Sequence, residues 1–439
     1  MEIDQGPRAV GSVLAAAEAA SPVEAVEVVT RELARALGAT WASFLIADLS
    51  GRAMVRLAHV RLRTVDGLDV STPIRPDERR FEEESATVLP FDGGPVEQAV
   101  RTQEVQVVEP DVGSSGPGGS APWLVLAPVT ERGEVIGLLE LALPEKPDSA
   151  VTGEIARMAH LLGFVVIANR RHTDLYEWGH RTRPLSLSAE IQHRLLPGPR
   201  TCEAGSFTLA AWLEPAAGIA GDTFDFSLER DLLHVSLTDA MGHGVAAALT
   251  ATLCVGSLRN ARTQGASLLE QVASTNQGLV DHAVNAGLED FVTGLVGRLD
   301  LRSGSMELVN AGHVSPYLAR GEQTTLVELP VDLPFGMFPE TSYRSSHVDL
   351  EPGDRIVFLT DGMLERGAVW VDLADAIAET RSLHPREAVR ALADRVLEAT
   401  SHALKDDATV LCLDWHGGHG QDRETVNGAE PARASQPLV

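Results

Sequence analysis

The 439-residue chain carries 62 acidic and 36 basic residues, a formal net charge of -26, and an ordinary 44% hydrophobic content. This charge argues against nucleic acid or an anionic membrane as the main partner, since both require a basic surface. The length exceeds what one hydrophobic core usually supports, so two domains are expected. Three scattered cysteines indicate reduced thiols in a cytoplasmic protein. The acidic N-terminus lacks a signal peptide's positive region, and no uncharged apolar run approaches the ~20 residues of a membrane span.

The first 170 residues alternate between helical and strand patterns. Residues 1–20 are expected to fray, and the spacing of Val26, Val29 and Leu33 predicts a helix that begins at Ser21-Pro22 and stops at Gly38. Residues 61–85 are polar and predict a lid, and 114–120 are rich in Gly and Ser. Strands are predicted at 41–47, 53–60, 86–91, 106–109, 123–129 and 133–143, with a short helix at 96–101 and a long one from about Asp148 to Thr173.

This order of helix, hairpin, lid, short helix, closing hairpin and exit helix resembles a GAF domain over residues 20–170. GAF domains are small-molecule or signalling modules with a central antiparallel sheet. The resemblance implies a sensor whose unknown ligand or partner would bind between the sheet and residues 61–110. A domain that only dimerises, or whose pocket is empty, fits the same order of elements. His59 is the only histidine before His160, and a single histidine is more often structural than a cofactor ligand.

A helical linker is predicted over residues 171–199, where Pro197 ends the helical pattern. The apolar positions of the helix before it fall near a heptad spacing. An amphipathic helix packed on its own domain explains this spacing, and a parallel homodimer that carries a signal between the domains is the alternative. In that helix the positions are Ile155, Met158, Leu162, Val165 and Val166. The apolar pattern resumes within the linker at Leu187, Ile191, Leu195 and Leu196. Residues 416–439 show no periodicity and predict a disordered tail.

Two carboxylates are predicted to face each other at the end of an apolar hairpin. Strands 222–228 and 232–238 flank Arg230-Asp231, so Asp222 falls opposite Asp239. The same face carries three apolar pairs: Phe224 with Leu237, Phe226 with Val235, and Leu228 with Leu233. Opposed like charges destabilise a ladder, and burial adds to the penalty. A divalent cation would reverse the sign of this interaction. A solvated rim would weaken the repulsion instead, and the pair alone leaves both interpretations open.

Two later strands also bring carboxylates to their ends. Asp361 follows the apolar strand that begins at Asp354, and it is predicted to share a face with Val357 and Leu359. Asp406-Asp407 precede a final strand over 408–413. Oxygen ligands without a Cys/His set suit Mg²⁺ or Mn²⁺ rather than zinc.

Five motifs occur in an order that resembles the bacterial SpoIIE/RsbU-type PPM (PP2C-like) serine/threonine phosphatases. They are Ala220-Gly-Asp-Thr-Phe-Asp225, Thr238-Asp-Ala-Met-Gly-His-Gly244, Asn310-Ala-Gly-His-Val-Ser-Pro316, Thr360-Asp-Gly-Met-Leu-Glu365 and Asp406-Asp-Ala-Thr409. The lead-in helix Ala189-Glu-Ile-Gln-His-Arg-Leu-Leu-Pro197 also resembles that family. The family usually has Gly-Gly-Asp where this chain has Ala220-Gly221-Asp222, a change that leaves the carboxylate in place. The resemblance covers about residues 185–415, and the phosphatase domain is expected at 200–415.

The resemblance implies an α+β chain in which an αββα sandwich of two antiparallel sheets follows the GAF-like domain. It also implies two Mn²⁺ or Mg²⁺ ions at one end of the sandwich. In this family a metal-activated water is the nucleophile, so no nucleophilic side chain is needed. Asp222 and Asp239 are the expected catalytic residues, as ligands of the metals. Strand parity alone does not choose between Asp406 and Asp407. The implied metal ligands are Asp239 as the bridge, the Ala240 carbonyl, Asp361, Asp406, and Asp222 directly or through water.

Two histidines have an open role. His243 and His313 each follow a glycine, and either could act as a general acid for the serine leaving group. A turn residue that caps or packs is the alternative for both. Gly242 and Gly244 are expected to allow the turn into a helix over 245–260. Thr293 is interpreted as ordinary strand content, with a hydrogen bond near the site as the alternative.

The predicted function is a cytoplasmic, metal-dependent protein serine/threonine phosphatase regulated by the GAF-like domain. The resemblance implies a phosphoserine or phosphothreonine substrate on a small regulatory protein, an anti-sigma-factor antagonist of the STAS type in a stress-response pathway. The rival is a catalytically silent regulator that only binds a partner, and the retained acidic motif positions argue against it. A metal-dependent nuclease fits poorly with the charge of -26.

Overall fold

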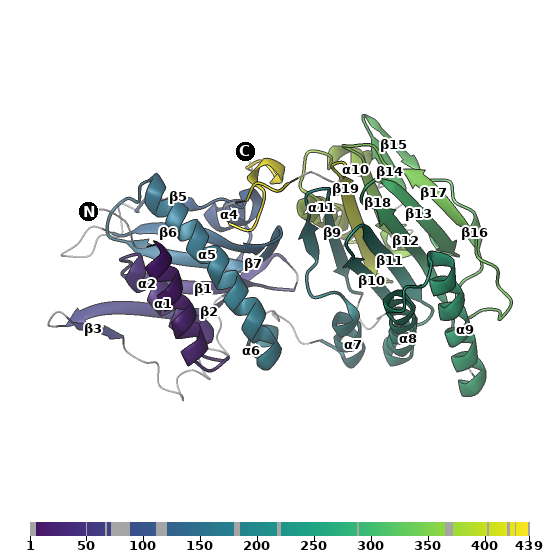
Figure 1. Ribbon diagram of the computed structural model, residues 1–439, viewed down its shortest axis with the longest axis horizontal. Coiled ribbons are helices and arrows are strands. Elements are labelled where there is room, and N and C mark those ends of the chain that lie inside the picture. Colours follow the sequence, from purple (N-terminus) through teal and green to yellow (C-terminus); the bar gives the residue numbers. More distant parts are fainter. Residues whose placement is uncertain are drawn as a thin grey trace. The chain divides into compact units, whose positions relative to one another are not determined.

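The chain divides into two compact units, shown with their elements labelled in Figure 1. One unit comprises Met1–Pro184 together with Glu424–Val439, and the other comprises Leu185–Arg423. The computed structural model describes residues 6–49, 51–65, 68–71, 88–110, 121–179, 185–216, 221–287, 289–364, 372–401, 404–418, 422–425 and 427–437.

The first unit is built on an antiparallel sheet of order β3-β2-β1-β7-β6-β5, with β4 paired to β2. Its strands are β1 Trp41–Ala47, β2 Ala53–Val65, β3 Leu68–Ser71, β4 Val88–Pro90, β5 Gln106–Val108, β6 Trp123–Glu131 and β7 Glu134–Leu143. The predicted strands are all present. β2 runs on to Val65 and pairs with β3, so the start of the predicted lid is a hairpin. The rest of that lid, from 72 to 85, lies outside the described residues, as does the Gly/Ser-rich stretch 114–120.

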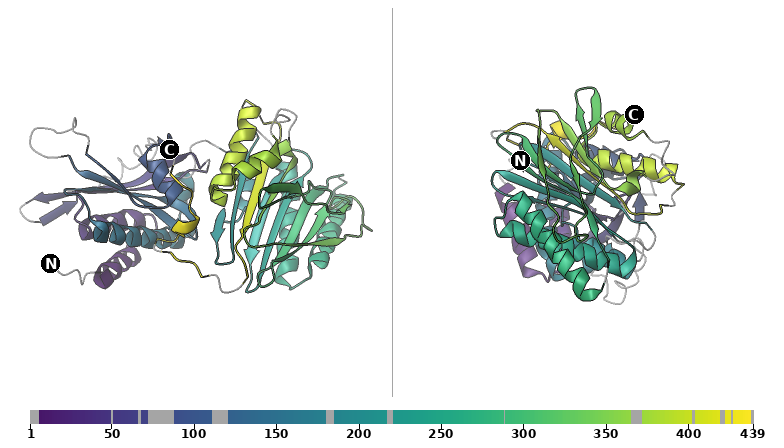
Figure 2. Two further views of the ribbon diagram at one scale, coloured as in Figure 1. Left: turned by 90° about the horizontal axis from the view of Figure 1, so that it is seen from above. Right: turned by 90° about the vertical axis from the view of Figure 1, so that its right-hand side faces the viewer.

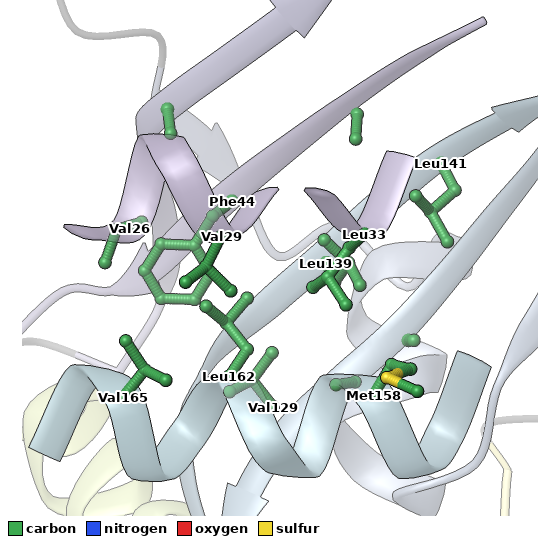
Figure 3. Packing of buried hydrophobic residues seen from close by; sticks show 14 of the residues in the cluster. Val26, Val29, Leu33, Phe44, Val129, Leu139, Leu141, Met158, Leu162 and Val165 are labelled. Carbon is green, nitrogen blue, oxygen red and sulfur yellow. The ribbon is translucent and has the colours of Figure 1, made fainter. Parts of the chain in front are cut away.

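Alternation along the strands gives this sheet two apolar faces. Phe44 packs in the cluster with α2 (Ala25–Ala36) and α5 (Ser149–Asn169), whereas its neighbour Leu45 packs with α4 (Pro95–Thr102) on the opposite face. Figure 3 shows the first cluster, with Phe44 among side chains from both helices. Residues Gly6–Ala19, expected to fray, form helix α1, whose Val13 is fully buried.

The second helix starts later than predicted. α2 begins at Ala25, because Ser21 does not cap the helix: its hydroxyl donates to the Glu24 carboxylate, and residues 22–24 form a turn. The predicted stop is confirmed, since Gly38 adopts a left-handed φ of 66° just after the helix. Helix N-termini are hard to predict here because Pro22 fits a turn as well as a first helical residue.

Helix α5 uses its apolar residues inside its own domain. Ile155 and Leu162 are fully buried and Val165 is 4% exposed, so the heptad-like positions pack on the sheet rather than forming a dimer seam. Exposing such side chains costs about 1.5–3 kcal/mol each. This agrees with a helix packed on its own domain, and the alternative of a dimer seam at these positions is not supported. Among the described residues, α5 and the turn after it have the length and hydropathy of a membrane span, but the buried face matches a core helix.

The predicted linker is not one helix. A short 3-10 turn η1 (Arg170–His172) and α6 (Leu175–Gly179) follow α5, and α7 (Leu187–Leu195) begins after a stretch that lies outside the described residues. Ser186 caps α7 by accepting a hydrogen bond from the Ala189 amide at 3.2 Å. The apolar positions up to Val166 and those from Leu187 onward therefore belong to different helices.

The tail also differs from its prediction as a disordered segment. Pro431–Arg433 forms a 3-10 turn, η4, and the Asn427 side chain donates to the Gln103 carbonyl at 2.6 Å. Composition misses this segment because polar hydrogen bonds and a glycine contact hold it, and neither creates an apolar period.

The second unit stacks two sheets between two helical layers, as Figures 1 and 2 show. The first sheet has the order β10-β11-β12-β13-β16, with β17 paired to β13, and the second has the order β15-β14-β18-β19-β9-β8. One apolar cluster fills the space between the sheets. The strands are β8 Thr201–Glu203, β9 Phe207–Glu214, β10 Asp222–Leu228, β11 Leu232–Ala240, β12 Val292–Asp300, β13 Ser305–Ala311, β14 Tyr317–Arg320, β15 Gln323–Leu326, β16 Val331–Asp332, β17 Ser345–Asp349, β18 Arg355–Leu359 and β19 Ala408–Trp415.

Two further apolar clusters attach the helices. α8 (Gly244–Thr263) and α9 (Leu268–Ala286) pack on the outer face of the first sheet, and α10 (Leu373–Glu379) and α11 (Pro385–Ala399) pack on that of the second. The expected αββα sandwich is confirmed. One pair departs from an antiparallel pattern, because β16 runs parallel to β13.

Candidate active site

The hairpin register is the one predicted from the residue numbers. β10 and β11 pair antiparallel with Asp222 opposite Asp239, and Phe224 opposite Leu237. Phe224 and Leu237 are buried in the cluster between the sheets, so the carboxylates continue an apolar face. Asp222 is 1% exposed and Asp239 is half-buried. The pair therefore lies at the end of the core rather than on a solvated rim.

Two glycines allow the backbone to close around this point. A Cβ on Gly221 would lie 2.5 Å from the Ala240 carbonyl oxygen, and one on Gly362 would lie 1.9 Å from the Asp407 carbonyl oxygen. Neither distance is compatible with a side chain. Gly221 also accepts a hydrogen bond from the Ala240 amide at 3.1 Å. The motif glycines thus bring Asp222 against Asp239 and the Asp361 turn against the Asp407 strand.

Asp361 reaches the site through a turn. β18 ends at Leu359, and residues Asp361–Leu364 form the 3-10 turn η2, in which Asp361 is exposed. Val357 and Leu359 face α10 and α11. The strand alternation therefore does not extend to Asp361, because Asp361 belongs to the turn and not to the strand.

Two threonines join the motifs of the second sheet to Asp222. The hydroxyls of Thr360 and Thr409 donate to Asp222 Oδ2 at 2.7 and 2.5 Å. The Thr409 amide donates to Thr360 Oγ1 at 3.0 Å. One carboxylate oxygen from the first sheet therefore holds Thr360, next to Asp361, and Thr409, two residues after Asp407. Sequence reasoning missed these threonines, although both stand inside quoted motifs.

The adjacent aspartates 406 and 407 have different surroundings. Asp407 is buried: its Oδ1 accepts from the Ala216 amide at 2.8 Å, and its Oδ2 accepts from the Gln192 side chain at 2.6 Å. Asp406 is half-buried and its Oδ1 accepts from the Asp407 amide at 2.9 Å. Asp407 is thus bonded to the protein through both of its carboxylate oxygens.

Like charge is concentrated here. Burial, and then Asp239 and Asp407, raise the pKa of Asp222 well above its usual value. Burial, followed by Asp361, Asp406 and Asp407, raises the pKa of Asp239 to about 7. Burial also raises the pKa of Asp407. The carboxylates destabilise one another's charged forms, and a cation among them would relieve this repulsion.

The carboxylates surround Asp239 without forming a closed cage. Within the described ranges, no three acidic, histidine or cysteine side chains converge closely enough to hold a metal ion as they stand. The donor set nevertheless suits a hard cation, because it consists of carboxylate oxygens and the Ala240 carbonyl. Binding would require the exposed Asp361 and half-buried Asp406 side chains to turn toward Asp239.

The two histidines have different surroundings. His313 is 7% exposed, its Nδ1 lies 2.8 Å from Thr293 Oγ1, and the Asn310 side chain closes its turn by hydrogen bonding to the His313 backbone. Burial lowers the pKa of His313 to about 4, so it is neutral near pH 7 and a poor proton donor. His243 is exposed at the N-terminus of α8. Thr293 lies opposite Asp239 in β12, and its described hydroxyl contact is to His313.

The turn glycines before α8 behave as predicted. Gly242 and Gly244 have φ of 99° and 75°, a region that a β-carbon disfavours. α8 starts at Gly244, one residue before its predicted start. This turn takes the chain away from Asp239 directly after Ala240.

Comparisons with known proteins agree with this geometry. The family model for Stage II sporulation protein E (SpoIIE) matches residues 229–416, and the model for the GAF domain matches residues 21–172. The chain therefore contains a SpoIIE domain over residues 229–416. Its N-terminal unit is a GAF domain, and the PPM-type phosphatase domain is the αββα sandwich described above.

Individual relatives of this phosphatase are distant. Phosphoserine phosphatase RsbU of Bacillus subtilis is 23% identical over 239 residues, which cover 52% of this chain and 69% of RsbU. Phosphoserine phosphatase RsbP of the same organism is 22% identical over 241 residues, covering 53% of this chain and 58% of RsbP. A crystal structure of the catalytic domain of the serine/threonine phosphatase PstP with two manganese ions is 18% identical, with a TM-score of 0.37, covering 48% of this chain and 98% of that one.

Proposed function

We propose that this phosphatase hydrolyses phosphoserine or phosphothreonine on a regulatory protein with the help of two divalent ions, Mn²⁺ or Mg²⁺. The observation that carries the proposal is the Asp222–Asp239 pair at the end of the hairpin ladder, in which Asp222 is buried and Asp239 half-buried. A protein gains nothing in stability from two opposed carboxylates withdrawn from water, and a divalent cation would convert their repulsion into attraction.

The proposed ligands follow from their positions around Asp239. Asp239 would be the ligand shared by the ions, because three other aspartates lie close enough to raise its pKa. Asp361 and Asp406 would complete the shell from the second sheet, while the Ala240 carbonyl and Asp222 would serve from the hairpin. Held by these residues, divalent ions would supply a water of lowered pKa as the nucleophile and positive charge for the phosphoryl oxygens.

The chain's own residues prepare this arrangement. Thr360 and Thr409 fix one oxygen of Asp222, and the Ala240–Gly221 hydrogen bond fixes the peptide whose carbonyl is proposed to bind. Because the Asp222 carboxylate and the Ala240 peptide are already fixed, they need not rearrange when the substrate binds. Asp222 and Asp239 are the proposed catalytic residues, and the buried neutral His313 stays outside the chemistry.

The substrate proposed is a small phosphoprotein, an anti-sigma-factor antagonist of the STAS type in a cytoplasmic partner-switching pathway. RsbU and RsbP, to which the chain is similar, carry the name phosphoserine phosphatase. The GAF domain would regulate the reaction through an unknown small ligand or partner. Part of the surface proposed for that ligand lies outside the described residues.

The proposal is tested with full-length protein, a phosphorylated antagonist and Mn²⁺. We expect phosphate release that requires the metal and is lost in Asp239→Asn. Activity that survives this change, or that persists in excess chelator, would contradict the metal assignment. A silent PPM-fold regulator would instead bind the antagonist without phosphate release and show no rise in melting temperature with Mn²⁺.

A further inference from the structure

A buried glutamine connects helix α7 to two of the site's aspartates. Gln192 is 2% exposed, although glutamine usually lies on the surface. Ser188, one turn earlier, is also buried, so these two residues define the inner face of an otherwise more exposed helix.

The Gln192 amide nitrogen donates two hydrogen bonds. One goes to Asp407 Oδ2 at 2.6 Å and the other to the Asp222 carbonyl oxygen at 2.8 Å. An amide nitrogen has two hydrogens, so both are used. A single side chain thus fixes the start of β10, which carries Asp222, and the carboxylate next to Asp406.

Helix α7 is itself held in place. Arg259 of α8 donates from Nη2 to the Leu195 carbonyl at 2.7 Å, near the end of α7, and also pairs with the buried Asp225. Ser186 caps the other end of the helix. The Arg259 contact therefore fixes the C-terminal end of α7 against α8, and the Ser186 cap stabilises the first turn of the helix.

We propose that Gln192 is a positioning residue for metal binding, an inference that rests on the proposed function. By bonding Asp407 Oδ2, Gln192 fixes the Asp407 side chain directly beside the proposed ligand Asp406 in the chain. By donating to the Asp222 carbonyl, Gln192 fixes the backbone of Asp222 at its position opposite Asp239. Residues that orient metal ligands in this way typically control metal affinity by about 10–100-fold.

The test measures Mn²⁺ affinity of metal-free full-length protein by calorimetry. We expect Gln192→Ala to weaken binding by about tenfold or more and to lower kcat more than KM. Arg194→Ala is the matched control on α7, since its exposed pair with Glu190 contributes little. Circular dichroism checks that the fold is kept.

A double-mutant cycle separates positioning from general damage. If Gln192 acts through Asp407, Gln192→Ala should have a smaller effect on Mn²⁺ affinity in an Asp407→Asn background, because the two changes remove the same charge-assisted bond. Mn²⁺ affinity of Gln192→Ala within twofold of wild type, or additive effects, would overturn the positioning role alone. Wild-type protein that binds no Mn²⁺ would overturn the proposed function as well.

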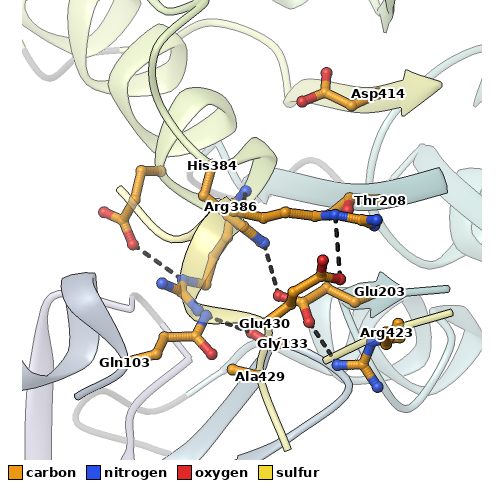
Figure 4. Close-up of polar contacts among 12 residues, drawn as sticks. Gln103, Gly133, Glu203, Thr208, His384, Arg386, Asp414, Arg423, Ala429 and Glu430 are labelled. Atoms are coloured by element: carbon orange, nitrogen blue, oxygen red, sulfur yellow. Dashed lines mark hydrogen bonds and ion pairs between the residues drawn. The ribbon is translucent and has the colours of Figure 1, made fainter. Parts of the chain in front are cut away.

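A second, independent observation concerns the C-terminal segment. Asn427 and Gly428 bind the turn between β6 and β7: Thr130 Oγ1 donates to the Asn427 carbonyl, and the Gly133 amide donates to the Gly428 carbonyl at 3.1 Å. The Asn427 side chain reaches the Gln103 carbonyl, and Arg101 Nε donates to the Gln436 carbonyl at 2.7 Å. Figure 4 includes Gln103, Gly133 and Ala429 of this region.

The fit at Gly428 is specific for glycine. Its φ is 89°, and a Cβ would lie 2.4 Å from the Thr130 carbonyl oxygen and 2.5 Å from His160 Nδ1. We infer that residues 427–437 are an integral part of the GAF domain, so that the phosphatase domain is inserted in the chain between two parts of its sensor. A truncated chain that ends after β19 would then lack part of the GAF fold.

Hydrogen exchange on the full-length protein tests this inference at the Gly133 amide. We expect Gly428→Ala and Asn427→Ala to speed exchange there by about tenfold, the equivalent of one lost hydrogen bond. Gly353→Ala is the matched control, because Gly353 has a similar φ of 95° but nothing within 4 Å of a Cβ. Unchanged exchange at Gly133 in both variants, or an equal change in the control, would overturn the inference.

Discussion

Two regions of the phosphatase domain treat buried charge in opposite ways. In the first, the balanced region, Glu203 of β8 is fully buried and bonded to His384 Nε2 at 3.1 Å and Arg423 Nη2 at 2.5 Å, as Figure 4 shows. In the second, the acidic site, Asp222 and Asp239 face each other with Asp407 beside them.

The pKa values record this difference. Burial alone would raise the pKa of Glu203, but hydrogen bonds and charges from His384 and Arg423 bring it down to about 2. At the acidic site, burial and neighbouring carboxylates act together, and the pKa of Asp239 rises to about 7. Burial therefore accompanies stabilised charge in one region and destabilised charge in the other. Only the second arrangement leaves free energy to be recovered by a bound cation.

The largest expected effect is on catalysis. Asp239→Asn keeps the shape of the side chain but removes the proposed bridging charge, and we expect Mn²⁺-dependent phosphate release to fall by roughly a thousand-fold. The exposed Asp281 of α9 supplies the control, since Asp281→Asn should leave the rate unchanged. A fall of less than about tenfold would place the chemistry elsewhere.

In the balanced region, removing one partner should destabilise the fold. Glu203→Gln removes the carboxylate that faces the buried His384 and the partly buried Arg423, and we expect a loss of roughly 3–5 kcal/mol in the free energy of unfolding. Denaturant titration measures this. Glu351→Gln breaks an exposed pair with Arg320 and should cost less than about 1 kcal/mol. Equal losses in the two variants would contradict the role of burial.

Metal should stabilise the acidic site. With Mn²⁺ at a hundred times its dissociation constant, we expect the free energy of unfolding to rise by about 2.7 kcal/mol. Thermal unfolding with Mn²⁺ and with chelator measures the difference, and Asp239→Asn should abolish most of it. A rise of the same size in that variant would place the bound ion at another site.

Acid should weaken the balanced region. The pKa of Glu203 is lower in the folded protein, so its contribution is present above about pH 4.5 and is lost as the pH falls toward 2. The pKa of His384 is also lowered, mainly by burial, so protonation of the unfolded chain below about pH 6.5 acts in the same direction. We expect roughly 2 kcal/mol of this acid sensitivity to disappear in Glu203→Gln. Denaturant titration across this pH range measures it.

The smallest expected effect has the opposite sign to most substitutions. In chelator at pH 8, Asp239→Asn removes a repelling charge and should raise stability by about 1 kcal/mol, or roughly 2–4 °C in melting temperature. Scanning calorimetry at low ionic strength measures it. A lower melting temperature would mean that the carboxylate is structurally satisfied without metal.

The sequence predicted those parts of the site that depend on strand period. The Asp222–Asp239 register follows from residue numbers, and the five ordered motifs resembled the family that the comparisons confirm. Asp361 was misplaced because a 3-10 turn interrupts alternation after Leu359. Thr360, Thr409 and Gln192 were missed because their partners lie far away in the chain, and no local pattern records such contacts.

In the GAF domain, strands were predicted well and segment ends poorly. β1 matches its predicted range, because alternation between two apolar faces is a strong signal. The start of α2 and the fate of the tail depended instead on single hydrogen bonds, at Ser21 and Asn427.

The hydrogen bond from Thr409 to Asp222 has a consequence for how the enzyme is made. It spans 187 residues, and Thr409 belongs to β19, which lies in the interior of its sheet between β18 and β9. Contacts of such long range form late, since the loop between them must first be closed. During synthesis, the chain would therefore expose no assembled catalytic centre until its last strand is in place. Phosphatase activity would then report completed folding of the whole domain.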